Sequence, residues 1–165
     1  ALGARIRPAG FYRAKARCLA GFCRWLLEVG GFTGLGERST DAIRKELLAL
    51  TGIGPETADC ILLYALGRPV FVIDAYTRRV LVRTGLHAIA DRAGYEALRT
   101  WIETRLPRDA AMFNEYHALF VAHGKAVCRA RPRCSDCTIA GACDYVRLAD
   151  NGRAARPPGT ASPSP

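Results

Sequence analysis

The stretch from Leu47 to Val80 (LLALTGIGPETADCILLYALGRPVFVIDAYTRRV) constrains the fold more than any other part of the chain. Its Gly52-Ile53-Gly54 turn separates two segments that carry apolar residues at helical spacing. Glycine adopts backbone conformations that other residues resist, so this turn can be tight. Pro55 suits the first position of a helix, because its missing N–H would be unpaired there. The pattern predicts a helix-hairpin-helix whose second helix can present backbone amides to a phosphate.

A short apolar run and an acid follow the hairpin. Val70–Ile73 is too short to indicate a sheet, and we expect it to be a buried extended connector. Asp74 then opens a helix that runs to about Thr84. A carboxylate at this position can cap the helix, and it can also stabilise positive charge in a transition state.

Helical periodicity predicts an all-α protein. We expect helices over residues 11–29, 40–50, 55–66, 74–84, 94–106 and 109–125. The glycines of residues 30–36 indicate a flexible connector, and the Pro/Gly/Ala/Ser-rich residues 149–165 indicate a disordered tail. His117 and His123 are most simply surface or capping residues of the last of these helices.

The charge of the chain indicates its partner. Lys and Arg number 24 against 15 Asp and Glu, giving a net charge of +9. Nucleic acid is therefore the leading partner and a membrane surface the second. No apolar run is long enough to span a bilayer. The chain opens with Ala1 and its only methionine is Met112, so we expect a truncated sequence.

Four of the seven cysteines lie close together near the C-terminus, with the spacing C-x5-C-x2-C-x5-C: Cys128, Cys134, Cys137 and Cys143. Thiols at this spacing can converge on one metal ion or cluster from a single loop. Spacing alone does not separate a zinc site from an iron–sulfur cluster. Disulfides are disfavoured, since nothing marks the chain as secreted. Arg129, Arg131 and Arg133 make the same loop basic, which suits contact with a DNA backbone.

Together these motifs resemble the endonuclease III superfamily of DNA glycosylases, over roughly Ile6 to Tyr145. The likeness rests on L-x-G-I-G-x-x-T-A, on the following V-I-D, on the cysteine loop and on I-x-x-x-G-F-Y-x-x-K-A from Ile6 to Ala16. It implies an all-α helix-hairpin-helix glycosylase fold in which residues 1–107 hold the hairpin (47–67) and the catalytic acid. Residues 108–148 would form a C-terminal helix and cluster loop, and 149–165 a disordered tail. Further N-terminal helices, one carrying a wedge side chain, would be missing.

The resemblance also implies a cofactor and a partner. Superfamily members carry a [4Fe-4S] cluster on C-x6-C-x2-C-x5-C, and the first gap here is one residue shorter; zinc remains the alternative. Double-stranded DNA would be held by the hairpin residues Gly52, Ile53, Gly54 and Thr57, with a monovalent cation on the hairpin carbonyls, and by the three loop arginines. We expect a monomer in the bacterial cytoplasm, associated with the nucleoid and not with a membrane.

The implied chemistry centres on Asp74, which matches the catalytic acid of the superfamily. Bifunctional members use a lysine two residues after the second hairpin glycine, and here that residue is Glu56, which cannot form a Schiff base. If Glu56 and Asp74 face one pocket, one of the two pKa values should rise, which suits a proton donor. Tyr76 takes the place where bifunctional members often have histidine, and it can stack on a flipped base.

We therefore expect a monofunctional glycosylase in which Asp74 activates water. The hairpin segment and the I-R-P-x-G-F-Y start look most like 3-methyladenine glycosylases of the endonuclease III type, so the expected substrate is an alkylated base. One alternative is a bifunctional glycosylase and abasic-site lyase acting on oxidised pyrimidines, with an amine from Lys15, Lys45 or Lys125. Others are a non-catalytic DNA-binding module and a zinc module that binds nucleic acid.

Overall fold

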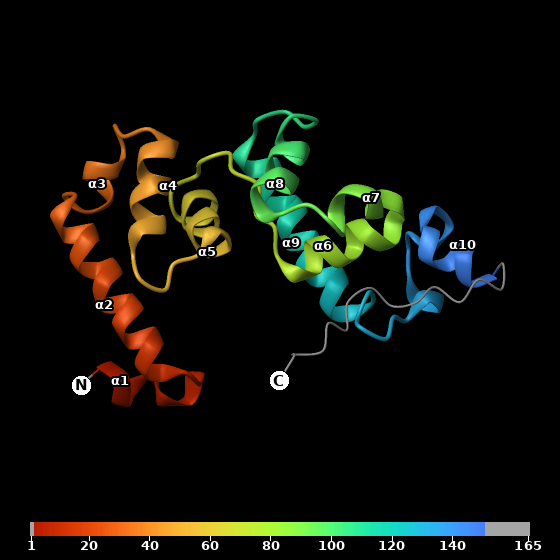
Figure 1. Ribbon diagram of the computed structural model, residues 1–165, viewed down its shortest axis with the longest axis horizontal. Coiled ribbons are helices and arrows are strands. Elements are labelled where there is room, and N and C mark those ends of the chain that lie inside the picture. Colours follow the sequence, from red (N-terminus) through yellow and green to blue (C-terminus); the bar gives the residue numbers. More distant parts are fainter. Residues whose placement is uncertain (1, 151–165) are drawn as a thin grey trace. The chain divides into compact units, whose positions relative to one another are not determined.

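The computed structural model describes residues 2–150, and every regular element within them is helical (Figure 1). The prediction of an all-α fold is confirmed for this part of the chain. The helices form two compact units, residues 2–72 with 108–113 and residues 73–107 with 114–150. This grouping differs from a division at residue 107. The start of helix α9 packs with the first unit, where the rings of Phe71 and Phe113 meet edge to face at 5.3 Å.

The first unit contains the helix-hairpin-helix. Its elements are α1 (Leu2–Arg5), η1 (Arg7–Ala9), α2 (Tyr12–Glu28), α3 (Gly31–Leu35), α4 (Thr40–Ala49), α5 (Pro55–Cys60) and the π-helical turn η2 (Ile61–Ala65). The hairpin joins α4 to α5, which continues into η2 as the sequence predicts (Figure 1). Trp25, Ile43, Leu47 and Leu62 form the buried centre of this unit, because α2, α4 and η2 turn their apolar faces toward one another.

An ion pair fixes the two hairpin helices to each other. The Arg44 guanidinium on α4 donates to both carboxylate oxygens of Asp59 on α5, at 2.6 and 3.1 Å. The Asp59 side chain is fully buried. A bidentate pair of this kind combines charge with fixed geometry, so it holds the angle between the helices on either side of the hairpin.

The expectation of a flexible connector at residues 30–36 is wrong, since α3 occupies most of it. One of the glycines, Gly34, is needed here because α3 approaches the end of α2 closely. A Cβ on Gly34 would lie 1.9 Å from the Val29 carbonyl oxygen, and the Gly34 amide donates to Gly30 O at 3.3 Å. The chain thus folds back tightly at the end of α2.

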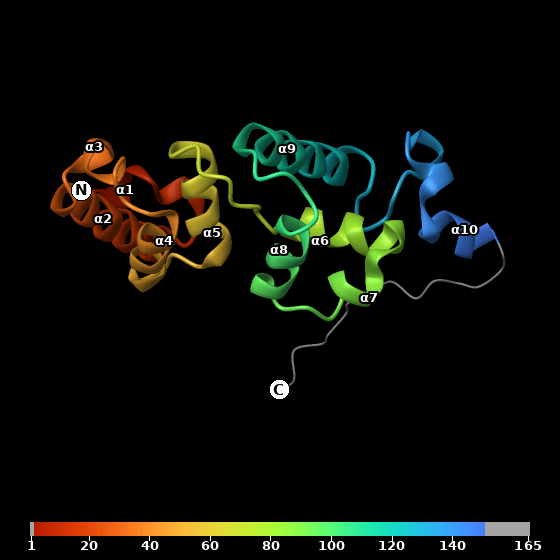
Figure 2. The same cartoon turned by 90° about the horizontal axis from the view of Figure 1, so that it is seen from above.

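The second unit is built around α6 and α9. Its elements are α6 (Ala75–Leu81), η3 (Val82–Leu86), α7 (His87–Ala90), α8 (Tyr95–Glu103), α9 (Ala110–Ala126, which begins in the first unit), η4 (Cys134–Asp136), η5 (Ala140–Ala142) and α10 (Asp144–Asp150). Helix α9 lies beside α6 (Figures 1 and 2), as the close contact between Tyr76 and Gly124 also shows.

Two boundaries of the expected organisation can be compared with the structure. Residues 70–73 form a connector without regular structure, and each of them is at most 3% exposed, as predicted. Helix α10 extends to Asp150, past the expected start of the tail at residue 149, and residues 151–165 lie outside the described part. None of the described helices is long and apolar enough to cross a membrane.

Candidate active site and cysteine loop

The hairpin exposes its glycines and buries its centre. Gly52 has a φ of +90°, and a Cβ there would lie 3.1 Å from Cys18 Cβ, so both conformation and space require glycine. Ile53 is 6% exposed and its amide donates to Leu50 O at 3.1 Å, so this residue anchors the turn in the core. Gly54 and Thr57 are exposed at the start of α5.

A hollow lies beside the hairpin within the first unit. It is lined by Lys15 and Cys18 of α2 and by Gly52 and Thr57 of the hairpin. The Lys15 ammonium donates to the Ala9 carbonyl oxygen, which places a positive charge at the edge of the hollow. An anion bound at the hairpin would therefore lie near a lysine.

Asp74 caps α6, as its position in the sequence predicts. Its Oδ1 accepts a hydrogen bond from the Thr77 amide at 2.6 Å, and its Oδ2 lies 3.6 Å from His117 Nε2 on α9. Burial raises the pKa of Asp74, but the interactions with His117 and Thr77 lower it by more. The pKa of Asp74 therefore lies below its usual range, and the carboxylate is ionised at neutral pH.

His117 is the site residue that the sequence does not reveal. The expectation of a surface or capping histidine is wrong, because His117 is 7% exposed and faces Asp74 across 43 residues of chain. One signal was available. His117 lies four residues after Phe113 and seven before Gly124, on the face of α9 that is buried. A polar residue on the buried face of a helix is a stronger indication of a functional role than an apolar residue there.

Tyr76 lies in the first turn of α6, two residues after Asp74, and is half-buried. A Cβ on Gly124 would come within 2.6 Å of its ring, so α9 packs directly against it. The Arg79 guanidinium carbon and the Lys125 ammonium lie 5.1 and 5.8 Å from the ring centre. These contacts hold the ring in one orientation.

Glu56 is exposed in the first turn of α5. It belongs to the first compact unit and Asp74 to the second. A pocket shared by the two carboxylates therefore stays a prediction.

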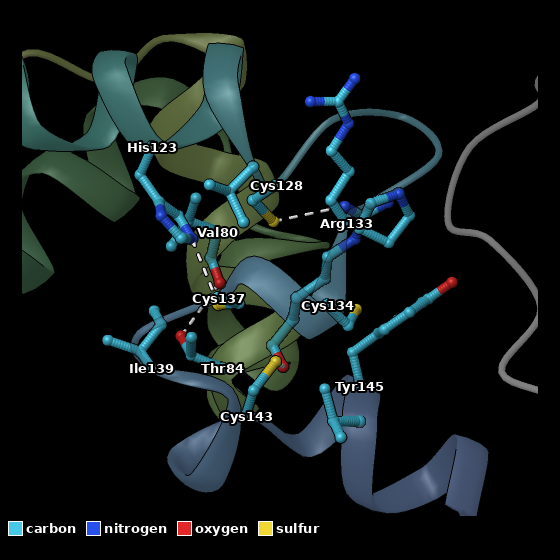
Figure 3. A pocket seen from close by; sticks show the side chains of 14 residues that line it. Val80, Thr84, His123, Cys128, Arg133, Cys134, Cys137, Ile139, Cys143 and Tyr145 are labelled. Carbon is cyan, nitrogen blue, oxygen red and sulfur yellow. Dashed lines mark hydrogen bonds between the residues drawn. The ribbon is translucent and has the colours of Figure 1, made fainter.

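The four clustered cysteines line one cavity in the second unit (Figure 3). Cys128 and Cys143 are buried, and Arg83 connects them. Its Nη1 donates to Cys128 Sγ at 3.3 Å, and its carbonyl oxygen accepts from Cys143 Sγ at 3.2 Å. Burial and the other three sulfurs raise the pKa of Cys134. Throughout residues 2–150, no three His, Cys, Asp or Glu side chains are close enough together to hold a metal ion.

Two arginines that the sequence analysis did not single out hold the cysteine loop in place. Arg83 is 5% exposed and also donates to the carbonyl oxygens of Arg129 and Ala130 at 2.6 and 3.0 Å. Arg79 donates to Cys128 O at 2.8 Å. Residues 129, 131 and 133, the arginines of the loop itself, are all exposed. Arg79 and Arg83 thus fix the backbone at the start of the cysteine loop, while the arginines of the loop present positive charge to solvent.

Comparison with known proteins identifies relatives along most of the chain. A protein of Methanocaldococcus jannaschii, whose name describes a DNA repair glycosylase, is 43% identical over 141 residues, covering 84% of this chain and 63% of the relative. Endonuclease III of Escherichia coli is 32% identical over 146 residues, covering 88% of this chain and 64% of the enzyme. The chain thus spans less than two thirds of the length of these relatives. No family model matches the sequence.

Solved structures show the same fold. An endonuclease III in a non-covalent complex with DNA superposes with a TM-score of 0.72 at 26% identity, covering 91% of this chain and 66% of that one. An endonuclease III trapped as a covalent DNA intermediate gives the same score and identity and covers 90% of this chain. The sequence relatives and the structural neighbours both support the endonuclease III superfamily as the family of this chain.

Proposed function

We propose that this protein is a base-excision DNA glycosylase that hydrolyses the N-glycosidic bond of a damaged base. The observation that carries the proposal is Asp74, an ionised and mostly buried carboxylate fixed at the start of α6. Relatives named as endonuclease III and DNA repair glycosylase support this class of enzyme.

Asp74 would act on the sugar and on water. As the bond between C1′ and the base nitrogen breaks, its electron pair leaves with the base and positive charge develops on the sugar. A nearby carboxylate stabilises that charge. Water then forms the new bond to C1′, and Asp74 takes its proton as general base. The products are an abasic sugar and the free base.

The proposed substrate is an alkylated base, and Glu56 is the reason. The lysine of bifunctional members is replaced by a side chain that forms no Schiff base, so in this proposal water is the nucleophile. A cationic alkylated base is already a good leaving group, which suits a site without a lysine. In this proposal Tyr76 forms a wall of the base pocket, and Glu56 serves as proton donor if it reaches that pocket.

DNA contact would use both units. We propose that amides around Gly52 and Gly54, with Thr57, hold a backbone phosphate, and that the loop arginines hold others. Ile53 would contribute by anchoring the turn. Phe11 is a further candidate, because it is 89% exposed and is followed by Tyr12 and Arg13. Exposed apolar side chains can enter a base step and hold it open.

We propose that the four cysteines hold a [4Fe-4S] cluster, with zinc as the alternative. One zinc ion would draw all four sulfurs to about 2.3 Å from a single point, whereas each thiolate of a four-iron cluster binds a different iron. The four cysteines line one cavity, and the endonuclease III relatives support a cluster there. When bound, the cluster would hold the basic loop together. Iron and acid-labile sulfide in the purified protein support it, and stoichiometric zinc without iron contradicts it.

One incubation tests the function. The protein is mixed with duplex DNA carrying 3-methyladenine, or separately an oxidised pyrimidine, and strand cleavage is read with and without alkali. Base release that needs alkali for strand cleavage supports hydrolysis without a lyase step. Release of neither base, with DNA still bound, would instead favour a non-catalytic binding module.

A bifunctional glycosylase and lyase is the second candidate, because the relatives include endonuclease III and a structural neighbour was trapped covalently on DNA. It requires an amine other than residue 56. Lys125 lies in the same compact unit as Tyr76, with its ammonium 5.8 Å from the ring centre. Borohydride trapping of a covalent adduct, lost in Lys125→Met, would select this candidate.

A further inference from the structure

We propose that His117 is a positioning residue for Asp74, holding its carboxylate in the orientation that base release requires. This inference rests on the proposed glycosylase function. Its starting point is a buried histidine that faces a mostly buried carboxylate from another helix.

The two carboxylate oxygens of Asp74 are held from different directions. Oδ1 accepts from the Thr77 amide of its own helix at 2.6 Å, and Oδ2 faces His117 Nε2 of α9 at 3.6 Å. One contact would leave the carboxylate free to rotate about it. Two contacts from two helices fix the plane of the group, as catalytic geometry requires.

The histidine occupies a position where packing alone would favour an apolar side chain. On α9 it stands between Phe113, which is fully buried, and Gly124, which packs against Tyr76. These positions share one face of the helix because they are separated by four and seven residues. Burying an imidazole there costs free energy unless its polar atoms are used, and the group it faces is Asp74.

The helix that carries His117 is itself fixed to the helix of Asp74. Arg79, on α6, donates to the carbonyl oxygens of Gly124 and Cys128 at 2.9 and 2.8 Å. Tyr76 packs against Gly124 from the same side. The distance between imidazole and carboxylate is therefore set by packed helices and not by a mobile loop.

The side chains of His117 and Asp74 are 9% and 11% exposed, so the carboxylate has little water around it. A polar group that faces an ionised carboxylate stabilises it more in such surroundings than at the surface. His117 thus offsets part of the cost of keeping Asp74 charged next to a developing sugar cation.

The test compares His117→Leu and His117→Gln with the wild-type protein. Leu removes the donor and keeps an apolar volume, whereas Gln can place an amide donor close to the position of Nε2. Under single-turnover conditions, His117→Leu should release the base roughly 10- to 100-fold more slowly, with DNA affinity unchanged within about twofold. His117→Gln should restore most of the rate. Equal losses for Leu and Gln would overturn the proposal.

A double variant shows whether His117 acts through Asp74. In an Asp74→Asn background, adding His117→Leu should cause no further loss, because the carboxylate that it positions is absent. A further loss as large as that in the wild-type background would mean that His117 acts independently, which contradicts the proposal.

A readout without catalysis separates this inference from the proposed function. Carboxyl carbon NMR of the protein, compared with Asp74→Asn to assign the signal, follows the titration of Asp74. His117→Leu should raise the pKa of Asp74. Burial raises this pKa, and without His117 only the contact with Thr77 would oppose that effect. If no base is released from any substrate, a raised pKa still supports the pair. An unchanged pKa would overturn the inference even in an active enzyme.

Discussion

Helices α5 and α6 begin in different ways, and each kind of helix start suits a different task. Helix α5 starts at Gly54 and Pro55, and its N-cap residue, a glycine, provides no side-chain cap. Helix α6 starts at Asp74, whose carboxylate accepts from the Thr77 amide. An uncapped start leaves amides for a ligand, and a capped start uses an amide to fix an acid. The uncapped start suits the binding of a phosphate, and the capped start suits catalysis by the fixed acid.

Removing the charge at the capped start should give the largest effect. Asp74→Asn keeps a good capping residue but loses the carboxylate, so stability and DNA affinity should change little. Base release should fall by about 10²- to 10⁴-fold, measured under single-turnover conditions. Asp109→Asn is the matched control, because Asp109 Oδ1 caps α9 by accepting from the Met112 amide at 2.9 Å. Unchanged release in Asp74→Asn would show that the capped start performs no chemistry.

Two glycine variants should separate folding from binding at the uncapped start. Gly52→Ala places a methyl group 3.1 Å from Cys18 Cβ at a φ of +90°, and we expect a loss of about 1–3 kcal/mol in the free energy of unfolding. In Gly54→Ala the added methyl group would have no atom of the described residues within 4 Å, so the free energy of unfolding should not change. This methyl group would cover the amides, and DNA affinity should fall roughly 2- to 10-fold. Urea unfolding and salt-dependent DNA titrations measure the two effects, and normal affinity in Gly54→Ala would argue against the phosphate site.

The packing behind the capped start should also be sensitive. Gly124→Ala would bring a methyl group to 2.6 Å from the ring of Tyr76, so α6 and α9 must move apart. We expect a loss of about 1–3 kcal/mol in unfolding free energy, and slower base release because Asp74 lies on the helix that shifts. Gly141→Ala, which meets no atom within 4 Å in the part of the chain described, is the control. Wild-type stability in Gly124→Ala would mean that this contact yields at little cost.

The smallest effect should appear in the dependence of stability on pH. The pKa of Asp74 is lowered on folding, so its charged form stabilises the folded state above the unfolded pKa of about 3.9. That contribution disappears as pH falls through the lower pKa of the folded state. The difference in urea midpoint between the wild-type protein and Asp74→Asn should therefore shrink below about pH 4. A constant difference would mean that the interactions at Asp74 do not favour its charged form.

Where a feature depends on neighbours along the chain, sequence reasoning found it. The hairpin follows from two glycines and a proline within four residues, and the cap on α6 joins Asp74 to the amide three residues later. The cysteine spacing predicted that the four thiols converge; the four cysteines line one cavity, but no three of these side chains lie close enough together to hold a metal ion. Such features are set by local backbone geometry, which does not depend on how helices pack.

The connector at residues 30–36 shows the limit of composition. Several glycines in a short run indicate flexibility, yet Gly34 is needed because α3 approaches the Val29 carbonyl closely. Composition does not distinguish a glycine that permits motion from one that permits contact.

The sequence by itself determined the all-α class, the hairpin, the capped acid and the thiol-rich loop. Only the tertiary structure decided what faces them: His117 opposite Asp74, Gly124 against Tyr76, and Arg83 between Cys128 and Cys143. These partners are separated by dozens of residues, and helical periodicity specifies which face is buried but not which helix covers it. The chemistry of the site depends on that choice, because burial and a facing imidazole set the charge and orientation of Asp74.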